Sequence, residues 1–164
     1  MRHRLRYQIL AFTATRAVFN ILYRMVYPFL PVLARGLGVD LQAMSLAMAF
    51  RALGGASGPF LASVSENRGR KSGMLLGLGL FVVGTALVAI RPVFLVFVIT
   101  IILTTLGKHT FDPAMQAYLG DRVPYARRGR ALAITELGWS LSFLPGAFLV
   151  WHRPDITHLC RVIK

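Results

Sequence analysis

Acidic residues and cysteine are scarce in this chain. Of its 164 residues, six are Asp or Glu, 19 are Lys or Arg, and one is cysteine. A single cysteine cannot form a disulfide within the chain, which excludes an internal disulfide framework. The few acids are not clustered, and neither paired histidines nor a serine-based catalytic motif occurs. We therefore expect no catalytic residues, no cofactor and no enzyme activity.

Charge of either sign is also rare, at 15% of residues, whereas 55% are hydrophobic. Soluble domains contain about 25% charged residues. The apolar residues come in long blocks rather than at amphipathic spacing, which indicates lipid as the solvent. A net charge of +13 in a soluble domain would suggest nucleic acid. Here the basic residues gather in short turns between the blocks, as in membrane proteins, so we expect no nucleic-acid partner.

Five apolar blocks are long enough, or nearly so, to cross a bilayer as helices, which takes about 20 residues each. They cover residues 7–34, 41–64, 72–90, 93–119 and 130–151. The alternation typical of barrel strands is absent, so the sequence predicts an all-α membrane bundle of five transmembrane helices in residues 1–151. The first block is too long for a signal peptide and holds two arginines, which favours an uncleaved span. The polar tail, residues 152–164, is expected to be disordered or foreign to the fold.

The basic residues alternate between the two ends of the predicted bundle. One end carries most of them: Arg2, Arg4, Arg6, Arg68, Arg70, Lys71, Arg122, Arg127, Arg128 and Arg130. The turns at the opposite end carry only Arg35 and Arg91. Because Lys and Arg are enriched on the cytoplasmic side, we predict a multi-pass cell-membrane protein with a cytoplasmic N-terminus.

Several polar residues lie within the apolar blocks, where a charge costs at least a few kcal/mol and suggests function. Arg16, Asn20 and Arg24 recur every four residues and share a helix face. We expect a polar cavity or coupling site formed by these and five others: Arg16, Asn20, Arg24, Arg51, Lys108, His109, Asp112 and Glu136.

Depth along the helices predicts ion pairs among these residues. At 1.5 Å per residue, Arg16, Asp112 and Glu136 lie about 10–12 Å from the cytoplasmic end. We therefore expect Arg16 to pair with Asp112 or Glu136, and Lys108 with Asp112 within one turn. Such pairs could simply hold helices together. The surplus of cations over anions would be balanced by an anionic small solute or by acidic groups of a partner.

His109 and Asp112 lie one helical turn apart, as two metal ligands could. Without a third ligand this pattern does not indicate a metal site, and none is expected. His109 is a better candidate for a proton-coupling group, because an imidazole titrates near physiological pH.

The turn "SVSENRGRKSG", residues 63–73, concentrates charge between the second and third blocks. It resembles the signature loop of the major facilitator superfamily, roughly G-x-L-A-D-R-x-G-R-K, with Glu66 at the position of the family's Asp. The stretch "DPAMQAYLGDRVPYARRGRALAITELGW" is similar to the end of the family's fourth span, the following turn and the start of its fifth span. The resemblance covers nearly all of residues 8–150.

The resemblance implies a secondary transporter of small solutes with two six-span halves. This chain would supply five spans of the first half, as a fragment, and a second half would be its covalent partner in the full-length protein. The resemblance also implies a conformational charge relay that includes Glu66, Gly69, Arg70, Lys71 and Asp121. A non-transporting membrane module or inert remnant is the alternative function.

Overall fold

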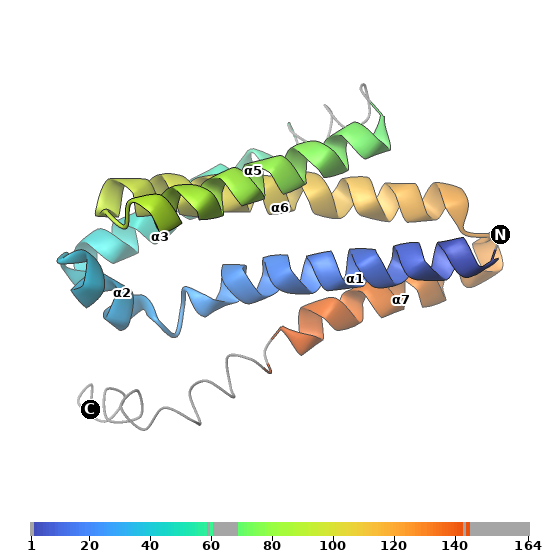
Figure 1. Ribbon diagram of the computed structural model, residues 1–164, viewed down its shortest axis with the longest axis horizontal. Helices are drawn as coiled ribbons and strands as arrows, with labels where there is room; N and C mark the ends of the chain where they lie inside the picture. Colours follow the sequence, from blue (N-terminus) through green and yellow to red (C-terminus); the bar gives the residue numbers. More distant parts are fainter. Residues whose placement is uncertain (1, 59, 61–68, 143, 145–164) are drawn as a thin grey trace. The chain divides into compact units, whose positions relative to one another are not determined.

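The computed structural model describes residues 2–58, 60, 69–142 and 144 (Figure 1). Within these residues the regular secondary structure is helical, which confirms the predicted all-α class. The helices are α1 (Arg2–Met25), α2 (Leu30–Leu37), α3 (Leu41–Ala56), α5 (Arg70–Ile90), α6 (Phe94–Arg122) and α7 (Tyr125–Leu141). The chain divides into two compact units. The terminal unit contains residues 1–28 and 134–164, and the central unit contains residues 29–133.

Two helices of the described chain, α5 and α6, are long and apolar enough to cross a membrane. The pair α1 and α2 meets the same criteria together, and gives a third span if the pair is counted as one. The predicted crossings by the second and fifth blocks stay predictions. The tail expected at residues 152–164 lies outside the described residues.

The first block, expected as one continuous helix over residues 7–34, is two helices. The helix α1 ends at Met25 and α2 begins at Leu30, with a turn between them. Pro28 lies in this turn, and proline cannot donate the backbone hydrogen bond that would continue α1. Pro31 lies in the first turn of α2, where a missing donor costs nothing.

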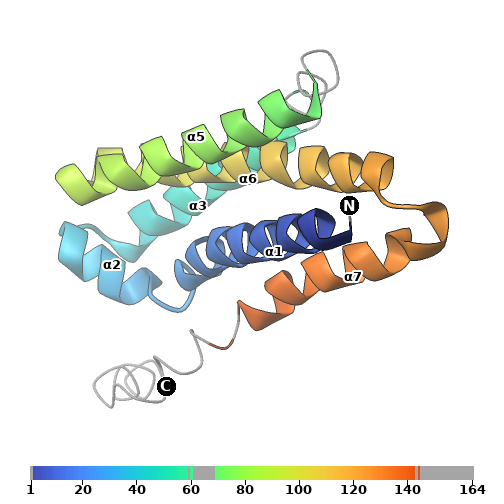
Figure 2. The ribbon, with the colours of Figure 1, turned by 45° about the vertical axis from the view of Figure 1, so that its right-hand side comes forward.

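The antiparallel pair α5 and α6 is the most closely packed part of the central unit (Figure 2). Gly77 and Gly107 face each other, and a Cβ atom built on either would lie 2.6 Å from the carbonyl oxygen of the other. Farther along, the Thr100 hydroxyl donates a 2.9 Å hydrogen bond to the Gly84 carbonyl across the pair. Glycine thus lets the two backbones touch, as in tightly packed membrane helices.

The helix α3 packs against the other side of α6 through its own glycines. A Cβ on Gly54 would lie 3.4 Å from Ile102, and one on Gly58 would lie 3.2 Å from the Cβ of His109. Small residues at this four-residue spacing are typical of close helix contacts. This contact brings the polar residues of α6 against α3.

In the terminal unit, α1 and the later part of α7 run side by side in the same direction (Figures 1 and 2). A Cβ on Gly138 would lie 2.7 Å from the carbonyl oxygen of Thr13. The backbones therefore approach as closely here as in the central unit. This approach places the polar face of α1 against α7.

We expect Gly77→Ala to lower the free energy of unfolding by about 1–3 kcal/mol, because the added methyl group overlaps the backbone of α6. The measurement is unfolding of the full chain in detergent micelles, followed by circular dichroism. Gly79→Ala is the matched control, since nothing lies within 4 Å of a Cβ at Gly79 on the same helix. Equal losses in both variants would contradict the proposed close contact.

Candidate functional site

The central unit carries an ionic cluster inside its apolar helices. The Lys108 ammonium donates to the Asp112 carboxylate one turn later on α6, and the two side chains are only 13% and 16% exposed. Arg51 of α3 is 3% exposed. The predicted Lys108–Asp112 pair is therefore present. The cluster, defined by Arg51, Lys108, His109 and Asp112, has two cations and one carboxylate.

His109, a member of the ionic cluster, packs against the glycines of α3. A Cβ on Gly55 would lie 3.5 Å from the imidazole Cε1, so the ring occupies space that a larger residue at this position would restrict. Arg51, Lys108 and Asp112 all interact electrostatically with the ring. Both ring nitrogens are buried, and neither has a hydrogen-bond partner within the described chain. The imidazole thus retains its hydrogen-bonding capacity for a ligand or water.

Pro113 follows this cluster inside α6. Proline lacks the N–H group that would bond to the carbonyl four residues earlier, which belongs to His109. The helix continues to Arg122 nevertheless. The charged side chains of α6 therefore lie next to a missing backbone hydrogen bond of the same helix.

The terminal unit carries a second polar face, formed by Arg16, Asn20 and Arg24 of α1. Arg16 is 6% exposed and donates a 2.5 Å hydrogen bond to Glu136 of α7. Arg24 lies over the Trp139 ring, 3.9 Å from the ring centroid to the guanidinium carbon. Between the arginines, Asn20 is fully buried, and its amide nitrogen and oxygen have no hydrogen-bond partner within the residues described.

The structure thus places the eight predicted cavity residues in two groups of four. Arg16, Asn20, Arg24 and Glu136 belong to the terminal unit, and Arg51, Lys108, His109 and Asp112 belong to the central unit. Of the two partners that the sequence left open for Arg16, Glu136 is the one with a hydrogen bond. A single cavity lined by all eight stays a prediction.

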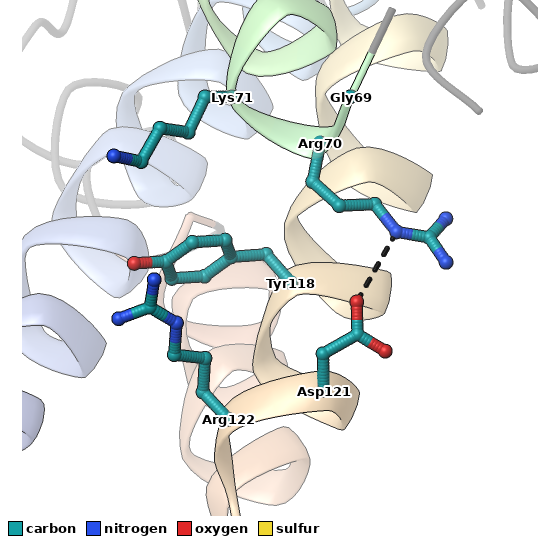
Figure 3. Close-up of a pocket in the computed structure, with 6 residues that line it drawn as sticks. All are labelled: Gly69, Arg70, Lys71, Tyr118, Asp121 and Arg122. Carbon is teal, nitrogen blue, oxygen red and sulfur yellow. Dashed lines mark hydrogen bonds and ion pairs between the residues drawn. The ribbon is translucent and has the colours of Figure 1, made fainter. Parts of the chain in front are cut away.

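Part of the charged turn is described, at the beginning of α5. Gly69 precedes the helix with a φ of 90°, a conformation that glycine adopts without strain. Arg70 donates a 3.3 Å hydrogen bond to Asp121 at the end of α6 (Figure 3). The predicted Arg70–Asp121 pair is therefore present. Glu66, the third charged member of the predicted relay, lies outside the described residues.

A hollow of about 410 Å³ adjoins this pair, and the sequence did not predict it. Its lining includes Lys71 and two residues that were not among the predicted site residues, Tyr118 and Arg122. The Arg122 guanidinium carbon lies 5.0 Å from the centroid of the Tyr118 ring. The four-residue spacing of these two residues indicates a shared helix face. Their proximity to Lys71 depends on the packing of α5 against α6.

The residues that could hold a metal ion do not come together in the described part of the chain. No group of three His, Cys, Asp or Glu side chains there has the required proximity.

Comparison with known proteins places these features in a family context. The model of the Major Facilitator Superfamily matches residues 12–150. An uncharacterized MFS-type transporter of Bacillus subtilis (strain 168), YwfA, is 28% identical over 123 residues, which are 74% of this chain and 30% of that protein. The inner membrane transport protein YdhP of Escherichia coli (strain K12) is 28% identical over 118 residues, 71% of this chain and 30% of that protein. The chain therefore spans about 30% of the length of these curated relatives.

We expect that exchanging the two charges of the Arg16–Glu136 pair restores the stability that either single reversal removes. Arg16→Glu and Glu136→Arg each place like charges together, whereas the double exchange restores the attraction. In a double-mutant cycle on unfolding in detergent, the coupling free energy should be about 1–3 kcal/mol. As a control, Arg130→Glu, which changes an exposed cation of α7, should not rescue Glu136→Arg. Additive losses from the two exchanges would refute the coupling.

Proposed function

The chain belongs to the major facilitator superfamily, and from this premise we propose that it takes part in carrying a small solute across the cell membrane. The observation that supports this proposal most directly is the ionic cluster in the central unit. A charge within a spanning segment is costly, and such charges commonly mark a solute or ion pathway. Arg51 is buried, and Lys108 and Asp112 are largely buried, on helices that are mostly apolar.

We propose that the solute is an anion. The cluster of the central unit contains two cations and one carboxylate, and the polar face of the terminal unit contains Arg16 and Arg24 with Glu136. A carboxylate or phosphate on the solute would compensate the excess positive charge in either group. Lys108 would then exchange its bond to Asp112 for a bond to the solute, and His109 would contribute a ring nitrogen to the same ligand.

The Arg70–Asp121 pair is proposed to stabilise one conformation of the carrier. It joins the beginning of α5 to the end of α6, and its side chains are 37% and 62% exposed. An exposed pair of this kind contributes about 0–1 kcal/mol, so it can break and re-form during a transport cycle. In this proposal Gly69 provides the turn, and Lys71 and Glu66 are the remaining members of the relay.

We also propose that the N-terminus and the Arg70–Asp121 end face the cytoplasm. The support is the concentration of Lys and Arg at that end of the helices. A further segment, equivalent to the second half of the longer relatives, would complete the carrier. Its polar residues would close the solute site from the other side.

The test is solute uptake into liposomes that contain the full-length carrier, in which this chain is joined to the proposed second half. The probes are radiolabelled succinate, phenylacetate and glycerol 3-phosphate, each compared with its uncharged analogue: succinamide, phenylacetamide and glycerol. We expect uptake of at least one anion above that of its analogue and above protein-free liposomes. The absence of uptake for every probe, with the chain correctly inserted, would favour a non-transporting membrane module instead.

Binding of the transported anion should depend on the cations of the ionic cluster. Arg51→Gln and Lys108→Gln should each weaken binding by roughly tenfold, because a hydrogen bond to a charged group contributes about 1.5–3 kcal/mol. The measurement is anion-dependent thermal stabilisation of the chain in detergent. Arg91→Gln, which removes an exposed cation outside the cluster, is the matched control. Arg51→Lys retains the charge and separates loss of binding from loss of folding.

A further inference from the structure

The hollow beside the beginning of α5 is a basic surface at the end of two membrane-crossing helices. Its lining contains three cations, Arg70, Lys71 and Arg122, and one carboxylate, Asp121. Arg70 and Asp121 form an ion pair with each other. Among the described lining residues, an excess of two positive charges therefore remains, on the side chains of Lys71 and Arg122. We call the hollow and its lining residues the basic hollow.

The geometry of the basic hollow separates this excess charge from the ion pair. In Figure 3, the Lys71 side chain lies above the Tyr118 ring and the Arg122 side chain lies below it, whereas Arg70 and Asp121 lie to the right of the ring. The Tyr118 side chain is largely buried, as the residue is only 8% exposed, and Arg122 lies over its ring. The ring thus forms an apolar floor between the two cations.

The position of the hollow follows from the unequal extents of α5 and α6. Gly77 lies opposite Gly107, and from this contact α5 begins seven residues earlier, whereas Asp121 follows fourteen residues later. At 1.5 Å per residue, Asp121 lies about 10 Å farther along the bundle than the first residue of α5. The long Arg70 side chain covers this difference. The end of α6 therefore overhangs the beginning of α5, at the depth where a spanning helix meets the headgroups.

The beginning of α5 adds to the positive potential. No acidic residue occupies its first turn, and no side chain of the described residues caps its first amide groups. These amides carry the positive end of the helix dipole. Cations, a helix beginning and an aromatic ring thus come together at one end of two helices that are long and apolar enough to cross a membrane.

From these features we propose that the basic hollow binds the phosphate of an anionic phospholipid headgroup. The phosphate lies between Lys71 and Arg122, and the glycerol backbone of the lipid contacts the Tyr118 ring. The excess of two positive charges matches an anionic lipid better than a zwitterionic one, whose ammonium group would meet the two cations. The proposal requires membrane insertion and does not depend on transport.

The test is native mass spectrometry of the full chain released from micelles that contain equal amounts of phosphatidylglycerol and phosphatidylcholine. We expect the wild-type chain to retain phosphatidylglycerol preferentially. Lys71→Gln with Arg122→Gln should lower that retention by roughly tenfold, because each cation near the lipid contributes to the attraction. Both side chains belong to exposed residues, so the double variant is expected to fold.

The matched control is Arg127→Gln with Arg130→Gln, which removes two exposed cations near the beginning of α7 but outside the hollow. Retention should be unchanged in this control. Equal losses in both double variants, or equal retention of the two lipids by the wild type, would overturn the proposal.

A second measurement distinguishes a lipid from free phosphate. Phosphorus-31 line broadening reports binding of inorganic phosphate to the chain in phosphatidylcholine nanodiscs. We expect broadening that is weak and the same in the wild type and in the Lys71→Gln, Arg122→Gln variant. Tight phosphate binding that this variant abolishes would overturn the assignment to a lipid headgroup.

Discussion

A lysine or arginine within a bilayer costs at least a few kcal/mol unless an opposite charge or a polar group meets it. Each unit of this chain meets that cost with one carboxylate: Asp112 for Lys108, and Glu136 for Arg16. The carboxylates are too few to compensate every buried cation. In the proposed function, the resulting excess of positive charge is what an anionic solute would compensate.

The charged residues can approach one another because glycine, rather than large apolar side chains, forms the helix contacts. Gly77 and Gly107 join α5 to α6, Gly54 and Gly58 join α3 to α6, and Gly138 joins α7 to α1. Lipid chains are as apolar as leucine, so burial of leucine contributes little to helix association. Many leucines of α5 accordingly lie on its exposed face, among them Leu75 and Leu78. Close backbone packing is what aligns the polar side chains.

Composition, spacing and depth were sufficient to predict the all-α class and the Lys108–Asp112 pair, and they reduced the possible partners of Arg16 to two acids. Lys108 and Asp112 are one turn apart, so their pairing follows from helix geometry alone. Arg16 and Glu136 are 120 residues apart in the sequence, so spacing does not relate them. Equal depth left Asp112 and Glu136 as the possible partners of Arg16. The resemblance to the family implied a relay that includes Arg70 and Asp121. Membership of the superfamily was predicted from the signature loop together with the second stretch, the number of spans and their orientation, and the family match over residues 12–150 confirms it.

Other features depend on tertiary contacts that periodicity does not encode. Periodicity gave the first block as one helix, because Pro28 interrupts an apolar pattern that continues on both sides of it. It did not distinguish Gly77, which touches α6, from Gly79, which faces open space. Tyr118 and Arg122 line the hollow only because the beginning of α5 packs beside them. Which polar residues face a common cavity is a question of how the helices pack, and sequence spacing alone does not answer it.

The unequal lengths of α5 and α6 make the chain sensitive to bilayer thickness. With 21 and 29 residues, the two helices are about 32 Å and 44 Å long. A hydrocarbon core of about 30 Å matches α5 and is shorter than α6. The longer helix must tilt or protrude, and a thinner membrane would increase the mismatch. Because the extra residues of α6 lie at its Asp121 end, the thickness of the host membrane would determine how far the Arg70–Asp121 pair extends beyond the hydrocarbon core.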